Sequence, residues 1–268
     1  VIDQEELKDQ VVASIETHRQ ELIDVANRVW EHAETALRET KSAEVLASYL
    51  ESQGFQVRRG VAGMSTAFVA EFGQGEPVIA IMGEYDALPG LSQSVSAEKE
   101  PVIEGAPGHG CGHNLFGAAS AGAAVAVKEA MDAHEIEGTI RFYGTPAEED
   151  IGGKIYMVKA DLFEDVDVAL AWHPNTKNEA DIQSSQAIVD FKVEFFGKTA
   201  HAAYDPWNGR SALDGLDLLI HALNLMREHV KPTVRIHYVI PEGGSVPNIV
   251  PETAVLWCWI RDSTRDGV

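Results

Sequence analysis

The sequence is poor in cysteine and has no long apolar segment. Its 268 residues include only two cysteines, Cys111 and Cys258, which is too few for the disulfide framework of a small secreted domain. It lacks a run of about 18 apolar residues that could span a bilayer, and its acidic start, VIDQEELKDQ, is unlike a signal peptide. These absences argue against a membrane-spanning or disulfide-stapled protein, and they predict a reducing, cytoplasmic setting.

Basic residues are also scarce. The 21 lysines and arginines face 42 aspartates and glutamates, which gives a formal net charge of −21. A surface this negative repels phosphate backbones and anionic lipids, so nucleic acids and membranes are not expected as partners. The acidity suits bound divalent cations, high solubility or a salt-rich cytoplasm, and it does not choose among them.

Several common catalytic motifs are missing. The sequence contains no GxSxG, GxxxxGK[ST], HExxH or CxxC motif, which argues against a serine-hydrolase elbow, a phosphate-binding loop, a zincin helix and a redox dithiol. The segment GHGCGHN at 108–114 lacks the GxGxxG spacing of a dinucleotide-binding turn. Any catalysis is therefore expected to come from a different arrangement of side chains.

Hydrophobic periodicity predicts alternating helices and strands in the first two thirds of the chain. Helical spacing covers residues 3–53, where Thr40 or Ser42 is expected to cap a second helix, and further helices are expected at 115–131 and 153–161. Short runs rich in Val, Ile and Phe predict strands at 55–59, 65–72, 78–83, 139–144 and 167–172. This alternation is typical of an α/β sandwich, and the almost wholly apolar strand 78–83 is expected in the centre of its sheet, covered on both faces.

A different pattern begins after the polar, turn-rich stretch 175–186. Strand-like residues are followed by one long helical segment and two more strands; the ranges are 187–196, 209–229, 233–240 and 253–261. The order strand, helix, strand, strand predicts a small α+β second domain.

Three polar segments contain residue types that bind metal ions. They lie at 108–114, directly after strand 139–144, and directly after strand 167–172; their candidate residues are His109, Cys111, His113, Glu148, Glu149, Asp150 and His173. Ligands of open α/β sheets gather outside the carboxyl ends of strands, so these segments are expected to converge. Each alone has an ordinary alternative: a hydrogen-bonded histidine, a buried thiol or a solvated acidic turn. Together their thiol, imidazole and carboxylate groups favour a zinc-like site.

The adjacent glutamates Glu148 and Glu149 suggest a division of roles. Adjacent side chains point in different directions, so one carboxylate can bind metal while its neighbour stays free as a general base. The free carboxylate would take a proton from a metal-bound water, which the ion has made more acidic. It would then return that proton to the leaving nitrogen of a substrate.

The sequence resembles the dinuclear-metal aminoacylase/carboxypeptidase family of amidohydrolases. Within the family it is most similar to the branch of the aminobenzoyl-glutamate hydrolases and the Xaa-Arg dipeptidases. The resemblance covers nearly the whole chain and rests on six motifs in the same order, which are GEYDALPG, GHGCGHNLFGAASAGAA, GTPAEEDIGGK, AWHP, FFGKTAHAAYDPWNGRSALD and GGSVPNIVPE.

The resemblance implies a catalytic α/β domain at 1–183 that binds two divalent metal ions. The thiolate favours zinc, with manganese or cobalt as alternatives. A smaller lid domain at 184–268 would mediate dimerisation, as a homodimer or a heteromer. The implied metal ligands are Cys111, His113, Glu149 and His173.

The resemblance also implies roles for residues outside that ligand set. Glu148 corresponds to the general base, and Asp86 would orient a metal ligand. His201 corresponds to a lid histidine that assists the substrate carbonyl in the partner subunit's site, and its alternative is an ordinary surface histidine. Asn248 corresponds to a residue near the substrate carboxylate, although Pro-Asn is also typical of a turn.

The sequence departs from the family pattern at three places. Many relatives have His-x-Asp where this chain has Glu84-Tyr85-Asp86, so the resemblance gives no metal role to Glu84, and Asn114 replaces an aspartate. The chain ends at Val268, before the family's return to the catalytic domain with its last histidine ligand. Two metal ions with shared ligands need about five protein groups, and the implied ligands number one fewer. We therefore expect a C-terminally truncated chain that binds metal weakly and is inactive.

The predicted function is hydrolysis of an amide bond next to a free carboxylate by a metal-bound hydroxide. Candidate substrates are N-acyl or aminobenzoyl amino acids and dipeptides. Two alternatives remain: a non-catalytic or regulatory partner subunit of such an enzyme, and a zinc-dependent structural or binding protein. The separate glutamate pair argues against the last, because closed structural zinc sites favour cysteine and histidine.

Overall fold

The computed structural model describes residues 3–180 and 185–268 of the chain. The chain divides into two compact units, Val1–Asn178 and Glu179–Val268. The predicted boundary between residues 183 and 184 lies outside the described residues.

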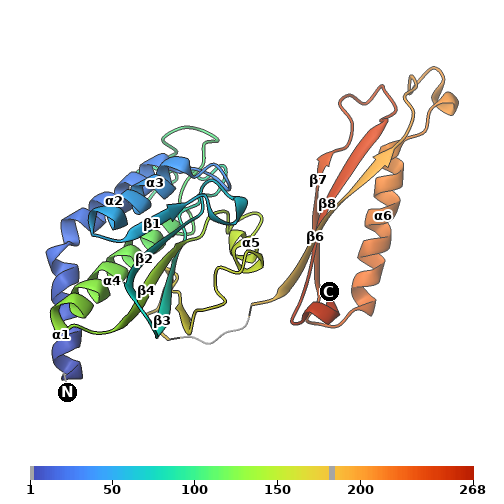
Figure 1. Ribbon diagram of the computed structural model, residues 1–268. Coiled ribbons are helices and arrows are strands. Elements are labelled where there is room, and N and C mark those ends of the chain that lie inside the picture. Colours follow the sequence, from blue (N-terminus) through green and yellow to red (C-terminus); the bar gives the residue numbers. More distant parts are fainter. Residues whose placement is uncertain (1–2, 181–184) are drawn as a thin grey trace. The chain divides into compact units, whose positions relative to one another are not determined.

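The first unit is built on a five-stranded mixed sheet (Figure 1). Its strands are β1 (Gln56–Arg59), β2 (Phe68–Gln74), β3 (Val78–Gly83), β4 (Gly138–Gly144) and β5 (Val168–Leu170), in the order β1-β2-β4-β3-β5. The neighbours β4, β3 and β5 are parallel, whereas β2 pairs antiparallel with both β1 and β4. The mixed sheet with flanking helices confirms the predicted α/β class, and β3 lies inside the sheet as its apolar sequence predicts.

Five helices flank this sheet. They are α1 (Gln4–Thr17), α2 (Arg19–His32), α3 (Thr40–Ser52), α4 (His113–His134) and α5 (Gly153–Lys159). The prediction of two helices within 3–53 is wrong, because the helical conformation is interrupted at His18. This residue occupies the C-cap position of α1 and the N-cap position of α2. The predicted cap of α3 is also wrong. The Glu34 carboxylate accepts hydrogen bonds from the backbone N–H groups of residues 41 and 42, so a preceding loop satisfies the helix end.

The alternation of side chains along the strands explains the two hydrophobic layers. Phe68, Ala70, Ile81, Ile140 and Phe142 pack in one cluster with residues of α2, α3 and α4. The alternate residues Val69, Ala80 and Tyr143 pack on the opposite face with Met157 of α5. Figure 1 shows α2 and α3 together on one side of the sheet and α5 toward the other. The carboxyl ends of β3, β4 and β5 are therefore held at one edge of a well-packed sheet.

The second unit is a three-stranded antiparallel sheet with one long helix. Its elements are β6 (Ala187–Phe196), α6 (Ala212–Met226), β7 (Arg235–Glu242) and β8 (Thr253–Asp262), with the strand order β6-β8-β7. The Ser211 hydroxyl caps α6 by accepting a hydrogen bond from Asp214 N. Leu216 and Leu223 of α6 pack against Leu256 and Cys258 of β8. This unit has the predicted α+β pattern.

None of the helices described is both long and apolar enough to cross a membrane.

Candidate metal centre

The candidate site lies at the carboxyl ends of the parallel strands. Gly83 ends β3 and pairs in register with Gly144, which ends β4. The polar residues Glu84 and Asp86 follow the first strand, and Glu148 and Glu149 follow the second. Because parallel strands bring their carboxyl ends to one edge of a sheet, residues far apart in sequence meet here.

A tight turn before α4 brings two more candidate ligands to this edge. Gly112 separates Cys111 from His113 and has φ of +81°, a left-handed conformation that glycine adopts without steric cost. A Cβ atom at this position would lie 3.0 Å from the Pro174 ring. Pro174 follows His173, so the close approach that glycine allows also brings this third residue to the turn.

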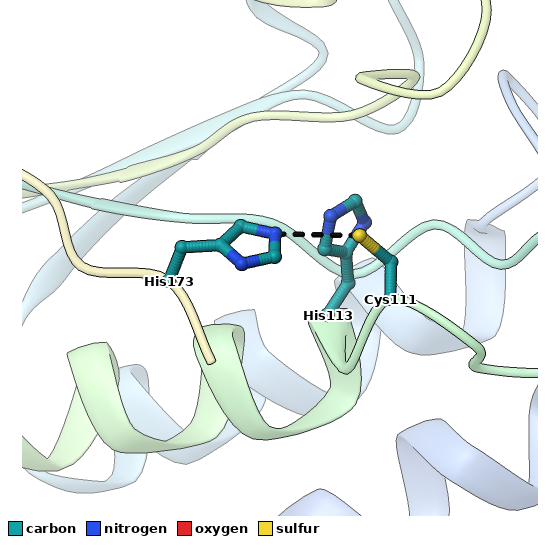
Figure 2. A group of neighbouring side chains, drawn as sticks. All are labelled: Cys111, His113 and His173. Carbon is teal, nitrogen blue, oxygen red and sulfur yellow. Dashed lines mark hydrogen bonds between the residues drawn. The ribbon is translucent and has the colours of Figure 1, made fainter. Parts of the chain in front are cut away.

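Three of the predicted ligands form a cluster (Figure 2). One ligand atom each from Cys111, His113 and His173 lies within 4.8 Å of the others. The Cys111 Sγ and His173 Nε2 atoms are 3.4 Å apart. The two residues come from the turn before α4 and from the segment after β5, so the predicted convergence of these segments is present in the described structure.

Asp86 is buried and connects two of the predicted ligands. Its Oδ1 accepts a hydrogen bond from His113 Nδ1 at 2.9 Å, and the Asp86 backbone carbonyl lies 3.1 Å from the same nitrogen. Its Oδ2 accepts a hydrogen bond from the backbone N–H of Glu149 at 2.9 Å. Because Nδ1 faces only acceptors here, it carries the ring proton. The lone pair of the neutral ring is therefore on Nε2, as a metal ligand requires.

Three carboxylates surround His113 Nε2. The nearest is Glu84 Oε2 at 2.9 Å, followed by Glu148 Oε2 at 3.9 Å and Glu149 Oε1 at 4.0 Å. Glu84, His113 and Glu148 form a second possible metal-binding group, which shares His113 with the first. Lys154 donates a hydrogen bond to the other oxygen of Glu84.

The donor atoms at this site fit a bound cation. Glu84 Oε2, His113 Nε2 and Glu149 Oε1 are all buried, and none has a hydrogen-bond partner within residues 3–180 and 185–268. A buried polar atom without a partner costs roughly 1–3 kcal/mol, so three such atoms at one place need an explanation. Their imidazole and carboxylate groups, with the neighbouring thiol, are the ligands that zinc takes in proteins.

In the absence of a cation, the local electrostatics favour the protonated forms of Cys111, His113 and Glu148. Burial raises the pKa of Cys111 to about 12, and the Glu149 and Glu148 carboxylates act in the same direction. Burial lowers the pKa of His113, but Asp86 and Glu84 outweigh this effect and raise it to about 10. Burial and neighbouring carboxylates also raise the pKa of Glu148. Metal ions bind the deprotonated forms, so binding here would displace protons.

His109 does not join the cluster, although it lies in the same sequence motif. Its Nε2 lies 3.0 Å from the backbone carbonyl of Val29 in α2, and burial lowers its pKa to about 4. His109 is therefore neutral and tied to the helical layer.

The two predicted residues of the second unit lie in adjacent segments. His201 forms an isolated bridge with Ile249, and the Asn248 backbone carbonyl accepts a hydrogen bond from Ala202 N at 3.0 Å. The His201 Nδ1 accepts the N–H groups of Ala203 and Tyr204, so Nε2 carries the proton of the neutral ring. His201 and Asn248 are both exposed.

Sequence reasoning missed two residues that shape this site, Lys154 and Glu39. Glu39 is fully buried, and its Oε1 accepts a hydrogen bond at 2.8 Å from the backbone N–H of Ala147. Ala147 has φ of +57°, which is strained for a residue with a side chain, and it directly precedes Glu148. No local pattern indicates either contact, because the partners are about 70 and 108 residues apart.

Replacing Glu39 with Ala is expected to destabilise the first unit. The substitution leaves the buried N–H of Ala147 without its acceptor, which costs about 1–3 kcal/mol. Urea denaturation followed by circular dichroism measures this change in the free energy of unfolding. Glu39→Gln is the matched control, since its amide oxygen keeps an acceptor, and it should lose less. Equal stability of Glu39→Ala and the unmodified protein would show that the contact is unimportant.

Comparisons with known proteins identify the family of this chain. Residues 80–265 match the model of peptidase family M20/M25/M40. The chain is 47% identical over 257 residues to a subunit of the p-aminobenzoyl-glutamate hydrolase of Escherichia coli (strain K12), covering 92% of this chain and 52% of that protein. It is 33% identical over 267 residues to the Xaa-Arg dipeptidase of Mus musculus, covering 95% of this chain and 58% of that protein.

A solved structure shares the fold. The aminobenzoyl-glutamate utilization protein from Klebsiella pneumoniae aligns with a TM-score of 0.71 and 22% identity, covering 96% of this chain and 70% of that one. The chain spans just over half the length of the two relatives above. Since the family model matches well over half of the chain, this protein belongs to peptidase family M20/M25/M40.

Proposed function

We propose that the protein hydrolyses an amide bond next to a free carboxylate at a centre of two divalent metal ions. The observation that carries this proposal is the convergence of Glu84 Oε2, His113 Nε2 and Glu149 Oε1, three buried donor atoms for which the described residues offer no partner. The names of the relatives support the substrate class, since p-aminobenzoyl-glutamate and Xaa-Arg dipeptides each contain an amide bond to an amino acid.

The ions would be held by Cys111, His113, Glu149 and His173, with zinc favoured by the thiolate and manganese or cobalt as alternatives. The cluster of Cys111, His113 and His173 supports one of these ions, and the second follows from the resemblance to the dinuclear-metal family. A divalent ion bound here would lower the pKa of a water molecule and polarise the substrate carbonyl. Asp86 keeps Nδ1 of His113 engaged, so that Nε2 faces the centre.

Glu148 is the proposed general base. Its side chain is 44% exposed, which leaves it open to water and substrate, while Glu149 is 19% exposed. The raised pKa of Glu148 brings it closer to the pH at which proton transfer in both directions is efficient. Glu148 would take a proton from the attacking water and return it to the leaving nitrogen.

The second unit would contribute to substrate binding and assembly. His201 can donate its Nε2 proton to the oxyanion of the substrate in a partner subunit's site, because Nδ1 is held by backbone N–H groups. Asn248, in the adjacent segment, would bind the substrate carboxylate. We assign the catalytic role to residues 1–183 and the lid and dimerisation role to residues 184–268.

Removing the metal is expected to abolish hydrolysis reversibly. Dialysis against a chelator should reduce the metal content and eliminate the turnover of p-aminobenzoyl-glutamate or a dipeptide by the protein that carries this chain. Adding zinc, manganese or cobalt should restore it. Elemental analysis should find two divalent ions per protomer before dialysis. Turnover that survives complete metal removal would contradict the proposal.

A role as a partner subunit is the second candidate function. It is favoured by the similarity of this chain to proteins that are named as two different subunits of one hydrolase. In that case the purified chain alone would bind metal without turnover, and activity would appear only when a second, related chain is added. Size-exclusion chromatography with activity assays on each fraction distinguishes a homodimer from a heteromer.

A further inference from the structure

We propose that Glu84 is itself a ligand of the metal centre, and that Lys154 holds its carboxylate in the required orientation. This inference rests on the proposed metal-dependent function and adds a fifth protein ligand to Cys111, His113, Glu149 and His173. Lys154 acts as a positioning residue, because its contact is with Glu84 rather than with the ion.

The buried atoms His113 Nε2 and Glu84 Oε2 face each other. His113 donates its Nδ1 proton to Asp86, so the neutral ring presents a lone pair at Nε2. Glu84 Oε2 lies 2.9 Å from this nitrogen, and it also carries lone pairs. Neither atom makes a hydrogen bond of acceptable geometry with any described residue, including each other. Without a cation the two atoms form an ion pair of poor hydrogen-bond geometry. Once Nε2 has lost its proton, the two lone pairs repel each other unless a cation binds both.

The distance between these two atoms fits two ligands of one zinc ion. Zinc binds imidazole nitrogen and carboxylate oxygen at about 2.0–2.2 Å. Two ligands on one ion, at angles between a right angle and the tetrahedral angle, are then about 2.8–3.5 Å apart. The observed 2.9 Å between His113 Nε2 and Glu84 Oε2 lies at the short end of this range. The two atoms are thus placed to bind the same ion with little movement.

Burial of Glu84 leaves only one of its two carboxylate oxygens compensated. Glu84 is only 5% exposed, and a carboxylate buried to this extent is costly unless its charge is compensated. Lys154, the second residue of α5, compensates one oxygen through its ammonium group. The other oxygen is left facing His113 Nε2. One oxygen is fixed and the other is available, which is the arrangement of a pre-oriented metal ligand.

The balance of charges at the site also favours bound cations. The carboxylates of Glu84, Asp86, Glu148 and Glu149 all lie within 4 Å of either His113 or its hydrogen-bond partners. Among the described residues, Lys154 is the one lysine or arginine that forms an ion pair with any of these four carboxylates, and its partner is Glu84. When a cation replaces the Nε2 proton of His113, three negative charges remain, and two divalent ions together with the Cys111 thiolate balance them.

The test compares metal binding by the full protein with that of two variants. Glu84→Gln removes the ligand charge, and Lys154→Met removes the ammonium but keeps the length of the side chain. Lys159→Met, at the other end of α5, is the matched control. Zinc affinity is measured by competition with a chromophoric chelator, and the ligand set is followed through the visible absorption of the cobalt-substituted protein.

Glu84→Gln is expected to weaken one of two zinc sites by at least about 100-fold and to change the cobalt spectrum. Lys154→Met should weaken the same site by about 10-fold with little spectral change, because the ligands stay the same. Lys159→Met should behave as the unmodified protein. Wild-type zinc affinity and an unchanged cobalt spectrum in a folded Glu84→Gln protein would overturn the proposal.

A crystal of the unmodified protein loaded with zinc gives a second test that does not depend on the folding of a variant. An anomalous peak within about 2.2 Å of a Glu84 oxygen supports the proposal, and peaks at the other ligands alone overturn it. If the unmodified protein binds no metal, the proposed function fails as well. If it binds two ions and hydrolyses amides without Glu84, only this inference fails.

Discussion

Replacing Glu148 with Gln is expected to lower kcat by at least about 100-fold and to leave the metal content unchanged. Glutamine has nearly the same size and shape as glutamate, but it cannot take a proton from the attacking water or return one to the leaving nitrogen. Steady-state kinetics on an amide substrate, together with elemental analysis of the same sample, measure both quantities in the protein that carries this chain.

Two further substitutions make this prediction specific. Glu148 Oε2 and Glu149 Oε1 lie 3.9 and 4.0 Å from His113 Nε2, so distance alone does not separate base from ligand. Glu149→Gln should lose bound metal, whereas Glu148→Gln should keep it. Glu164→Gln, on an exposed residue after α5, should change neither. Near-normal turnover in Glu148→Gln, or loss of metal from it, would reverse the assignment of the two roles.

The strands were predicted best where the residue pattern of the segment itself indicates a strand. The range 78–83 coincides with β3 and 187–196 coincides with β6, because a continuous apolar run marks a strand inside a sheet, and a run of β-branched and aromatic residues marks a strand in general. The strand predicted at 167–172 is limited to Val168–Leu170. It lies at the sheet edge, where only one neighbour supplies backbone hydrogen bonds.

The cluster of Cys111, His113 and His173 was predictable, because the carboxyl ends of parallel strands lie side by side. Cys111, His113 and His173 are residues of metal-binding types at predicted element boundaries, and these boundaries meet at the carboxyl ends of the parallel strands. The same rule placed Glu148 and Glu149 near them. This prediction needed only the type and position of each residue, and no knowledge of tertiary contacts.

The remaining contacts depend on tertiary packing. Glu39 reaches the Ala147 backbone, and Lys154 reaches Glu84, across layers of the fold. In each case the local sequence offers an equally good alternative, such as an exposed acid near a helix start or a lysine on a surface helix. Likewise, the break at His18 lies inside a continuous helical pattern. Only the assembled layers decide between these alternatives.

Replacing Asp86 with Asn is expected to lower metal affinity by about 10–100-fold, nearly as much as replacing it with Ala. Both oxygens of Asp86 accept from donors, namely His113 Nδ1 and the backbone N–H of Glu149. An asparagine has one oxygen and one NH2 group. Its NH2 group, itself a donor, would therefore face either His113 Nδ1–H or the backbone N–H of Glu149. The affected partner would then turn away, and one predicted ligand would lose its orientation.

Zinc affinity of Asp86→Asn, Asp86→Ala and the unmodified protein is measured by chelator competition, with Asp132→Asn as the control. Asp132 is a half-exposed carboxylate on α4 that pairs with Lys128, so its loss should leave zinc affinity unchanged. If Asp86→Asn binds zinc as the unmodified protein does, the carboxylate does not orient the ligands through its two hydrogen bonds. The result with asparagine carries the test, because it keeps the side-chain volume and changes only the match of donors to acceptors.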